Sequence, residues 1–88
     1  MSNKIPVSVL AATGSVGQRF ISLLANHPWF EVVEITASDR SVGQPYEDAC
    51  HWLLPEPMPE YVKKMVLKPT EAASLTQSAI AFSALPAQ

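Results

Sequence analysis

The hydrophobic pattern of this chain changes its period at one short segment, LAATGSVGQ, residues 10–18. Before it, residues 5–11 form a nearly continuous apolar run, which is typical of a parallel strand buried on both faces. After it, the apolar side chains have the spacing of one helix face: Val16, Phe20, Leu23 and Leu24. Asn26 and Pro28 predict the end of this helix, because asparagine tolerates a left-handed conformation and the residue before proline resists helical geometry. A second apolar run, residues 30–37, completes the order strand, turn, helix, strand of a βαβ unit.

The second half of the chain predicts a continuation of this pattern. Residues 54–59 contain alternating prolines and are expected to form an extended loop. We expect a short strand at residues 65–68, a short helix at 71–75 and a last strand at 79–85. With right-handed crossovers, this order predicts the α/β class and a Rossmann-like parallel sheet of about four strands with flanking helices. Because no helix follows the last strand to cover it, we expect the N-terminal part of a longer, doubly wound domain.

Composition excludes several classes of function. A chain of 88 residues, 48% hydrophobic and 16% charged, is long enough for one small globular domain. Its net charge of -2 gives no electrostatic basis for binding nucleic acid, and no segment predicts a membrane span. No His or Cys cluster has metal-ligand spacing, and the single Cys50 can form no internal disulfide, so we expect no metal and a reducing, cytoplasmic location. Asp48 and His51 lie near Cys50, but a lone cysteine is more often a small buried hydrophobic residue than a nucleophile.

Gly14 and Gly17 lie between the predicted strand and helix, where glycines can form a phosphate-binding turn. Gly14 would let the backbone approach a pyrophosphate, and Gly17 would let helix and strand pack closely. We expect the helix to begin near Ser15, so that the amides of Ser15 and Val16 point at the anion from the positive end of the helix dipole. The alternative is an ordinary strand-to-helix turn, which can also contain glycine and serine.

Ala11 stands where the first glycine of such a turn is usually found. A positive φ at this position would cost an alanine about 1 kcal/mol. Either Ala11 therefore has a negative φ, or the phosphate site is slightly displaced.

A polar segment, Ser38-Asp39-Arg40-Ser41, follows the second predicted strand. In dinucleotide-binding folds an acidic residue here binds a ribose 2′-hydroxyl, whereas a nearby arginine accommodates a 2′-phosphate. The two serines add hydroxyl donors that suit a phosphate, and we expect Asp39 to point toward solvent. Taken with the glycines, the segment favours NADP over NAD; taken alone, it could be a solvated loop.

Three segments, VLAATGSVGQRFISLLANHPWFEV, ITASDRSVGQPY and AFSALP, together resemble the N-terminal part of the aspartate-semialdehyde dehydrogenase family, particularly its archaeal and fungal branch. The resemblance covers nearly the whole chain. It implies an enzyme that uses NADPH to reduce β-aspartyl phosphate to aspartate semialdehyde and phosphate, on the route to lysine, threonine and methionine. It also implies that residues 1–88 are the NAD(P)-binding portion, that a catalytic and dimerisation domain lies beyond them, and that the full-length protein is a homo-oligomer.

The resemblance assigns roles to three groups of residues. The phosphate turn would contain Thr13, Gly14, Ser15, Val16 and Gly17. The 2′-phosphate would be held by Ser38, Arg40 and Ser41. The nicotinamide side would be bordered by Ser83, Ala84 and Leu85. The family usually has glycine at the position of Ala11.

No catalytic residue is expected within this chain. The nucleophilic cysteine and the histidine acid/base of the family lie further along the sequence, and Cys50 is not at the nucleophile's position. The 88 residues alone are therefore expected to be inactive. Two other interpretations stay open at this point: a related acyl-phosphate or acyl-CoA reductase, and a truncated, non-catalytic module that binds a dinucleotide or is purely structural.

Overall fold

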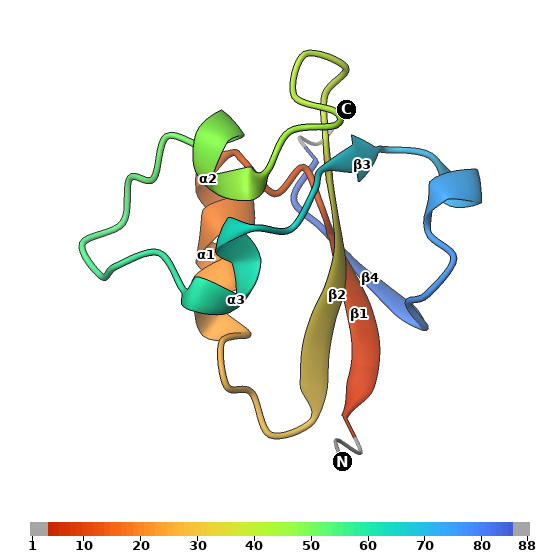
Figure 1. Ribbon diagram of the computed structural model, residues 1–88. Coiled ribbons are helices and arrows are strands. Elements are labelled where there is room, and N and C mark those ends of the chain that lie inside the picture. The colour runs from red at the N-terminus through yellow and green to blue at the C-terminus, as the bar shows by residue number, and fades with distance from the viewer. Residues whose placement is uncertain (1–3, 86–88) are drawn as a thin grey trace.

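The structure, a computed structural model, describes residues 4–85, which contain a parallel sheet in the order β3-β2-β1-β4 (Figure 1). The strands are β1 (Ile5–Leu10), β2 (Phe30–Ala37), β3 (Lys68–Pro69) and β4 (Ile80–Ser83). The helices are α1 (Ser15–Leu23), α2 (Tyr46–Ala49), α3 (Glu60–Lys63) and the short 3-10 helix η1 (Ala72–Ser74). This strand order is that of the first half of a doubly wound nucleotide-binding sheet, so the predicted α/β, Rossmann-like class is confirmed.

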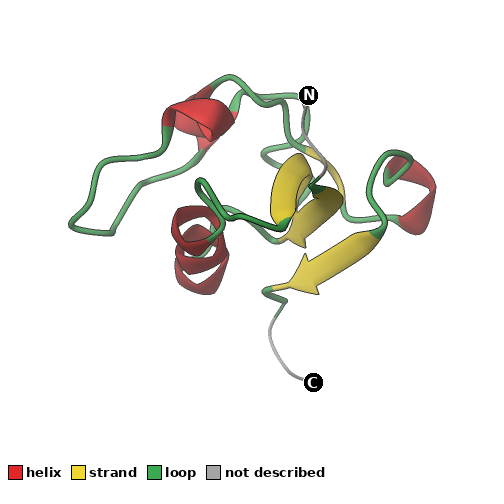
Figure 2. Cartoon of the chain, turned by 90° about the horizontal axis from the view of Figure 1, so that it is seen from below, coloured by secondary structure: helices red, strands yellow, loops and turns green. Residues whose placement is uncertain are grey.

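One face of the sheet is apolar and is covered by α1, α2 and α3, which all lie on the same side (Figures 1 and 2). Paired residues of neighbouring strands share a face. On this face Val9 pairs with Ile35 of β2 and with Phe82 of β4. The Phe82 ring packs against Phe20 of α1, with ring centroids 5.6 Å apart. We call this side of the sheet the apolar face; it carries most of the hydrophobic core.

The opposite side, which we call the polar face, presents Ser8, Glu34 and Thr36, all of them buried. Among residues 4–85, only η1 and the chain around it lie on this side (Figures 1 and 2). Residue alternation alone would put Glu34 on the apolar face, opposite Val9. The pairing of β1 with β2 shifts between Val7 and Ser8, however, so that Ser8 pairs with Glu34 and Val33 becomes an extra residue in β2. This bulge moves the carboxylate onto the polar face.

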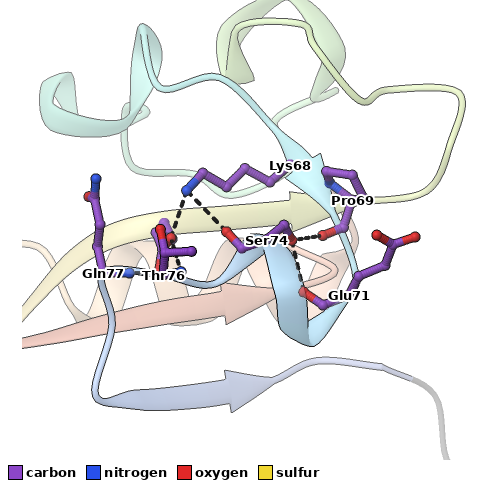
Figure 3. A network of polar contacts seen from close by, with 7 residues as sticks. Lys68, Pro69, Glu71, Ser74, Thr76 and Gln77 are labelled. Atoms are coloured by element: carbon purple, nitrogen blue, oxygen red, sulfur yellow. Dashed lines mark hydrogen bonds and ion pairs between the residues drawn. The ribbon is translucent and has the colours of Figure 1, made fainter.

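The carboxylate of Glu34 accepts several bonds, among them those from Lys68 Nζ at 2.6 Å and from the amides of Thr76 and Gln77 at 3.0 and 3.2 Å. Figure 3 shows these donors and Ser74, whose carbonyl also accepts a bond from Lys68. Burial tends to raise the pKa of Glu34, but Lys68 and the hydrogen bonds outweigh it and hold this pKa at about 2, well below its usual 4.5. The connection from β3 to β4 is therefore held to the sheet through one buried charge.

The first half of the chain agrees closely with the sequence-based expectations. Helix α1 begins at Ser15, as predicted, and Asn26 has the left-handed conformation (φ 57°) expected beyond the end of the helix. Residues 54–59 belong to neither helix nor strand, as expected for their prolines.

Three predicted elements of the second half have different bounds. The strand expected at 65–68 begins only at Lys68, because Val66 pairs in an isolated antiparallel bridge with Pro45. The helix expected at 71–75 is the three-residue η1, since the single Ser74 hydroxyl proton lies within reach of the backbone carbonyls of both Pro69 and Glu71 and competes with helical bonding. The last strand is shorter than 79–85.

Helices α2 and α3 were not expected from the sequence. Each has four residues and follows a proline, Pro45 or Pro59, in extended conformation. Four residues are too few to show the helical period from which a helix is predicted.

Candidate nucleotide-binding site

The predicted site residues lie at one edge of the sheet, which is formed by the carboxyl ends of β1, β2 and β4. Leu10 pairs with Ser83, and its carbonyl accepts a bond of 3.0 Å from the amide of Ala84. On the other side of β1, the amide of Ala12 donates to the carbonyl of Thr36 at 2.9 Å. The turn after β1 is therefore central, with the 38–41 segment on one side of it and the 83–85 segment on the other. Ligands of open α/β sheets bind at such an edge, where the strand order reverses.

Residues 11–14, which we call the glycine turn, begin with a strained alanine. Ala11 has φ 59°, in the left-handed region, so the alternative of a negative φ is wrong. Thr36 of β2 fixes this conformation: its hydroxyl oxygen accepts a bond from the amide of Ala11 at 3.1 Å, and its carbonyl binds Ala12 as described above. Since such strain persists only where the surroundings enforce it, Thr36 is a structural part of the turn.

The two glycines have different reasons to be glycine. A Cβ built at Gly17 would lie 2.7 Å from the Cα of Ala12, so only glycine lets α1 pack this closely. The close contact is with the glycine turn after β1 and not, as predicted, with the strand itself. At Gly14 the backbone is extended (φ -78°), and a Cβ would meet only the carbonyl oxygen of Ala11, at 3.9 Å. The fold itself thus does not require Gly14. A Cβ there would lie in largely open space beside the turn.

The N-terminus of α1 offers free donors at this point. Within residues 4–85, the amides of Ser15, Val16 and Gly17 donate to no protein group, and the bonding of the helix starts with Gln18 to the carbonyl of Gly14. Gly14 supplies no side-chain cap, and the first turn contains no acidic residue. Unpartnered amides at the positive end of a nine-residue helix are a suitable anion site.

Residues 38–41, which we call the SDRS loop, form a turn closed by the amide of Ser41 and the carbonyl of Ser38, 2.9 Å apart. Ser38, Asp39 and Arg40 are exposed, and Ser41 is partly buried. The carbonyl of Arg40 accepts a bond from the side chain of Gln44. In the described part of the chain the Arg40 guanidinium makes no ion pair, so its charge is available to a ligand.

A recess of about 180 Å³ lies near this loop, on the side of η1. It is lined by Leu10, Thr70, Glu71, Ala72 and Leu75. The Thr70 hydroxyl lies 2.9 Å from the hydroxyl of Thr36 and 3.3 Å from the carbonyl of Ala37, which directly precedes the SDRS loop. The recess therefore adjoins both the strand that leads to the glycine turn and the start of the SDRS loop.

On the β4 side, Ser83 is exposed and its hydroxyl accepts a bond of 3.3 Å from the amide of Leu85. Ala84 is tied to Leu10, as described above, and the Leu85 side chain is about half exposed. The three predicted residues therefore lie beside the glycine turn, opposite the SDRS loop.

Two buried side chains that the sequence did not single out contact the glycine turn from within the protein. The Tyr46 hydroxyl donates to the carbonyl of Ala12 at 2.7 Å, and Gln18 Nε2 donates to the carbonyl of Thr13 at 2.9 Å. Burial raises the pKa of Tyr46, which keeps this hydroxyl protonated as a donor. Gln18 could have been noticed as a polar residue on the same helix face as Ile21; nothing in the sequence marks Tyr46.

Cys50 follows a polar stretch of the sequence, which predicts a loop away from the glycine turn. That prediction is wrong: Cys50 is buried, and its sulfur is 3.8 Å from the carbonyl oxygen of Thr13. Burial raises the pKa of the thiol, partly offset by a contact with Tyr46. A raised pKa disfavours the reactive thiolate.

Across residues 4–85, no group of three or more His, Cys, Asp or Glu side chains could hold a metal ion. In the same residues no helix is long and apolar enough to cross a membrane.

Comparison with known proteins shows what the chain is similar to. A family model described as "Semialdehyde dehydrogenase, NAD binding domain" matches residues 6–88. The aspartate-semialdehyde dehydrogenase of Methanothermobacter thermautotrophicus is 47% identical over 83 residues, which is 94% of this chain and 24% of that protein. That of Saccharomyces cerevisiae is 44% identical over 87 residues, or 99% of this chain and 24% of that protein. The chain thus spans about a quarter of the length of these relatives.

A solved structure shows the same similarity in three dimensions. The crystal structure of aspartate-semialdehyde dehydrogenase with NADP from Candida albicans superposes with a TM-score of 0.85 at 42% sequence identity. The match covers 96% of this chain and 24% of that one.

Proposed function

The chain belongs to the family of semialdehyde dehydrogenase NAD-binding domains, and on that premise we propose that residues 1–88 are the NADP-binding portion of an NADPH-dependent aspartate-semialdehyde dehydrogenase. Its archaeal and fungal relatives carry that enzyme name, and the similar Candida albicans structure is of the enzyme with NADP. The reaction of the whole protein would be the reduction of β-aspartyl phosphate to aspartate semialdehyde and phosphate, which serves the synthesis of lysine, threonine and methionine. A cytoplasmic, homo-oligomeric enzyme is part of the same proposal.

The observation that carries the proposal is the set of unpartnered amides at the start of α1, together with an Arg40 guanidinium that makes no ion pair within residues 4–85. A dinucleotide phosphate needs both features, donors at a helix N-terminus and a cation next to the adenosine ribose. Gly14 supports the same function. The protein's own packing does not require glycine at this position, whereas a phosphate bound close to the backbone would.

The residues fit NADP as follows. The pyrophosphate would be held by Thr13, Gly14, Ser15, Val16 and Gly17. Ser38, Arg40 and Ser41 would hold the 2′-phosphate, and the apolar recess beside Leu10 would accept the adenine ring. Ser83, Ala84 and Leu85 would border the nicotinamide, the group that supplies the hydride when the cofactor is bound. No residue of this chain is proposed as nucleophile or acid/base, so these residues alone would bind the cofactor without turning over substrate.

Arg40→Ala tests the proposal through the choice of cofactor. Hydrogen bonds to a charged group contribute about 1.5 to 3 kcal/mol, so the variant should bind NADPH roughly tenfold to a hundredfold more weakly. NADH, which has no 2′-phosphate, should bind almost as before. Fluorescence titration of the intact protein with each cofactor measures both values.

Lys64→Ala is the matched control, since Lys64 is an exposed cation beyond α3 that the proposal does not use. It should change neither affinity. Equal losses of NADPH and NADH binding in Arg40→Ala, or a preference of the unmodified protein for NADH, would contradict the assignment of the SDRS loop.

A further inference from the structure

The backbone of the glycine turn is held on its inner side by three side chains. Thr36 accepts the amides of Ala11 and Ala12 through its hydroxyl and its carbonyl. The carbonyls that follow, those of Ala12 and Thr13, receive bonds from Tyr46 and Gln18. The amides of Ala11 and Ala12 and the carbonyls of Ala12 and Thr13 are therefore bonded toward the interior. Within residues 4–85, the amides from Thr13 to Gly17 donate to no protein group.

Tyr46 and Gln18 also connect the turn to the chain that follows the SDRS loop. Tyr46 is the first residue of α2, and its side chain is fully buried, at 0% exposure. Gln18, 1% exposed, donates a second bond to the carbonyl of His51 and accepts one from the amide of Leu53, at 2.9 and 2.8 Å. The segment 46–53 is thus attached to the turn by bonds that use the whole Gln18 amide.

We infer that Tyr46 and Gln18 are positioning residues for the cofactor, which hold the glycine turn in the conformation that presents the amides of α1 to the pyrophosphate. This inference rests on the proposed function. The strain at Ala11 gives the turn a reason to relax when these bonds are lost, because alanine disfavours φ near 59°. A site that must be reordered on binding has a lower affinity than one that is already in place.

The chain contains a matched control for Tyr46. The hydroxyl of Tyr61, like that of Tyr46, donates to a backbone carbonyl. Its acceptor is Ile21 in α1, at 2.8 Å. The two tyrosines thus make the same kind of bond at nearly the same distance, but only the bond of Tyr46 reaches the glycine turn. A loss that appears in Tyr46→Phe and not in Tyr61→Phe comes from the turn and not from the loss of a tyrosine hydrogen bond in general.

The test measures the affinity of the intact protein for two ligands, NADPH and 2′-AMP. Adenosine 2′-phosphate carries the group expected at Arg40 but lacks the pyrophosphate. Tyr46→Phe should bind NADPH about five- to tenfold more weakly, the value of one hydrogen bond, and bind 2′-AMP within about twofold of the unmodified protein. Tyr61→Phe should bind both ligands within about twofold of the unmodified protein, whatever its thermal stability.

Any other outcome refutes either the positioning role or the proposed function. Unchanged NADPH affinity in Tyr46→Phe, equal losses for NADPH and 2′-AMP, or an equal loss in Tyr61→Phe would each refute the positioning role. If Tyr46→Phe does not fold, Gln18→Met, which keeps the length of the side chain and removes its donors, must show the same selective loss. An unmodified protein that binds neither ligand would refute the proposed function and this inference with it, whereas binding that Tyr46→Phe leaves intact refutes the inference alone.

Discussion

The apolar and polar faces of the sheet, which share the backbone of β2, contact the rest of the chain through different forces. On the apolar face, Val9, Ile35 and Phe82 lie against α1, and each contact contributes through buried surface. On the polar face, Glu34 and Lys68 hold the β3–β4 connection through charge and hydrogen bonds. Buried surface is lost in small steps when side chains change. A buried carboxylate, by contrast, stabilises only while its partner and its ionisation are both intact.

The difference follows from what each crossover contains. Helix α1, with nine residues, can bury an apolar stripe, whereas η1 has three residues and none of them is buried. A short connection that cannot bury enough apolar surface is ordered here by donors aimed at one acceptor. Thr36 connects the two sides of the sheet, because it lies on the polar face and binds the glycine turn, on which α1 packs.

The largest effect is expected from Gly17→Ala, which breaks the close packing of the apolar side. The new Cβ would meet backbone atoms of Ala12, which cannot rotate away, so α1 must shift. We expect a loss of about 3 kcal/mol in the free energy of unfolding. Hydrogen exchange of the α1 amides in the intact protein measures it.

Gly14→Ala is the control within the same turn, since its Cβ would approach no protein atom closer than 3.9 Å. It should leave the exchange of α1 nearly unchanged and weaken NADPH binding instead. Similar destabilisation by the two substitutions would show that the two glycines do not have separate roles, Gly17 in packing and Gly14 in the approach of the ligand.

Glu34→Gln should have the next largest effect, on the polar face. It removes the charge and leaves Lys68 without its partner, for which we expect a loss of about 2 to 3 kcal/mol, at the low end for a buried pair because Lys68 is 33% exposed. The amides of Thr76 and Gln77, which donate to this carboxylate, should lose protection in hydrogen exchange before α1 does.

Glu47→Gln is the matched ion-pair control. Glu47 lies 2.6 Å from Lys64, the same distance as between Glu34 and Lys68, but the Lys64 side chain is 87% exposed. Its loss should change stability little. If the two substitutions destabilise equally, burial of the Glu34 carboxylate is not what orders the β3–β4 connection.

Acid should weaken the polar face selectively. Because the pKa of Glu34 is lowered from 4.5 to about 2 in the folded protein, its contribution is complete above about pH 5 and is lost as the pH falls toward 2. By pH 3 the loss should be about 1 to 2 kcal/mol, after allowance for solvent screening at Lys68. Denaturant titration at pH 6 and pH 3 measures the change, which should be smaller in Glu34→Gln; an identical pH dependence in that variant would assign it to other groups.

The smallest effect, and the only stabilising one, is expected from Ala11→Gly. Glycine adopts φ near 59° without the steric penalty of alanine, so the free energy of unfolding should rise by about 1 kcal/mol. The gain corresponds to a melting temperature about 4 to 8 °C higher for a domain of this size. A lower melting temperature would mean that Ala11 adopts another backbone conformation in solution.

The sequence predicts the parts of this fold that depend on neighbouring residues. The change of period at Gly14, the start of α1 at Ser15 and the left-handed Asn26 are all local signals. Glu34 could not be recognised in the same way, because the run in which it lies contains a second glutamate, Glu31, and nothing local distinguishes the two. Its partner Lys68 is 34 positions away, and the bulge at Val33 is visible only once β2 is paired with β1.

The candidate site shows the same division. The SDRS loop and the glycines follow predicted strands, so their common edge could be inferred from the order of the elements. The φ of Ala11 and the contact of Tyr46 with Ala12 depend on side chains from distant segments, which meet only in the folded chain.

The extra residue in β2 changes, partway along the strand, which residues lie on which face of the sheet. Up to Val32 the strand alternates in one frame and from Glu34 onward in the other, because Val33 is an extra residue with no partner in β1. Removal of Val33 would leave a regular strand in which Ser8 still pairs with Glu34 and Val9 with Ile35. Removal of a residue beyond the bulge, such as Ile35, would instead bring Thr36 opposite Val9 on the apolar face, and its bonds to the glycine turn would be lost without any change at the turn itself. The geometry of the candidate site is therefore encoded partly in the number of residues that follow Val33 in β2.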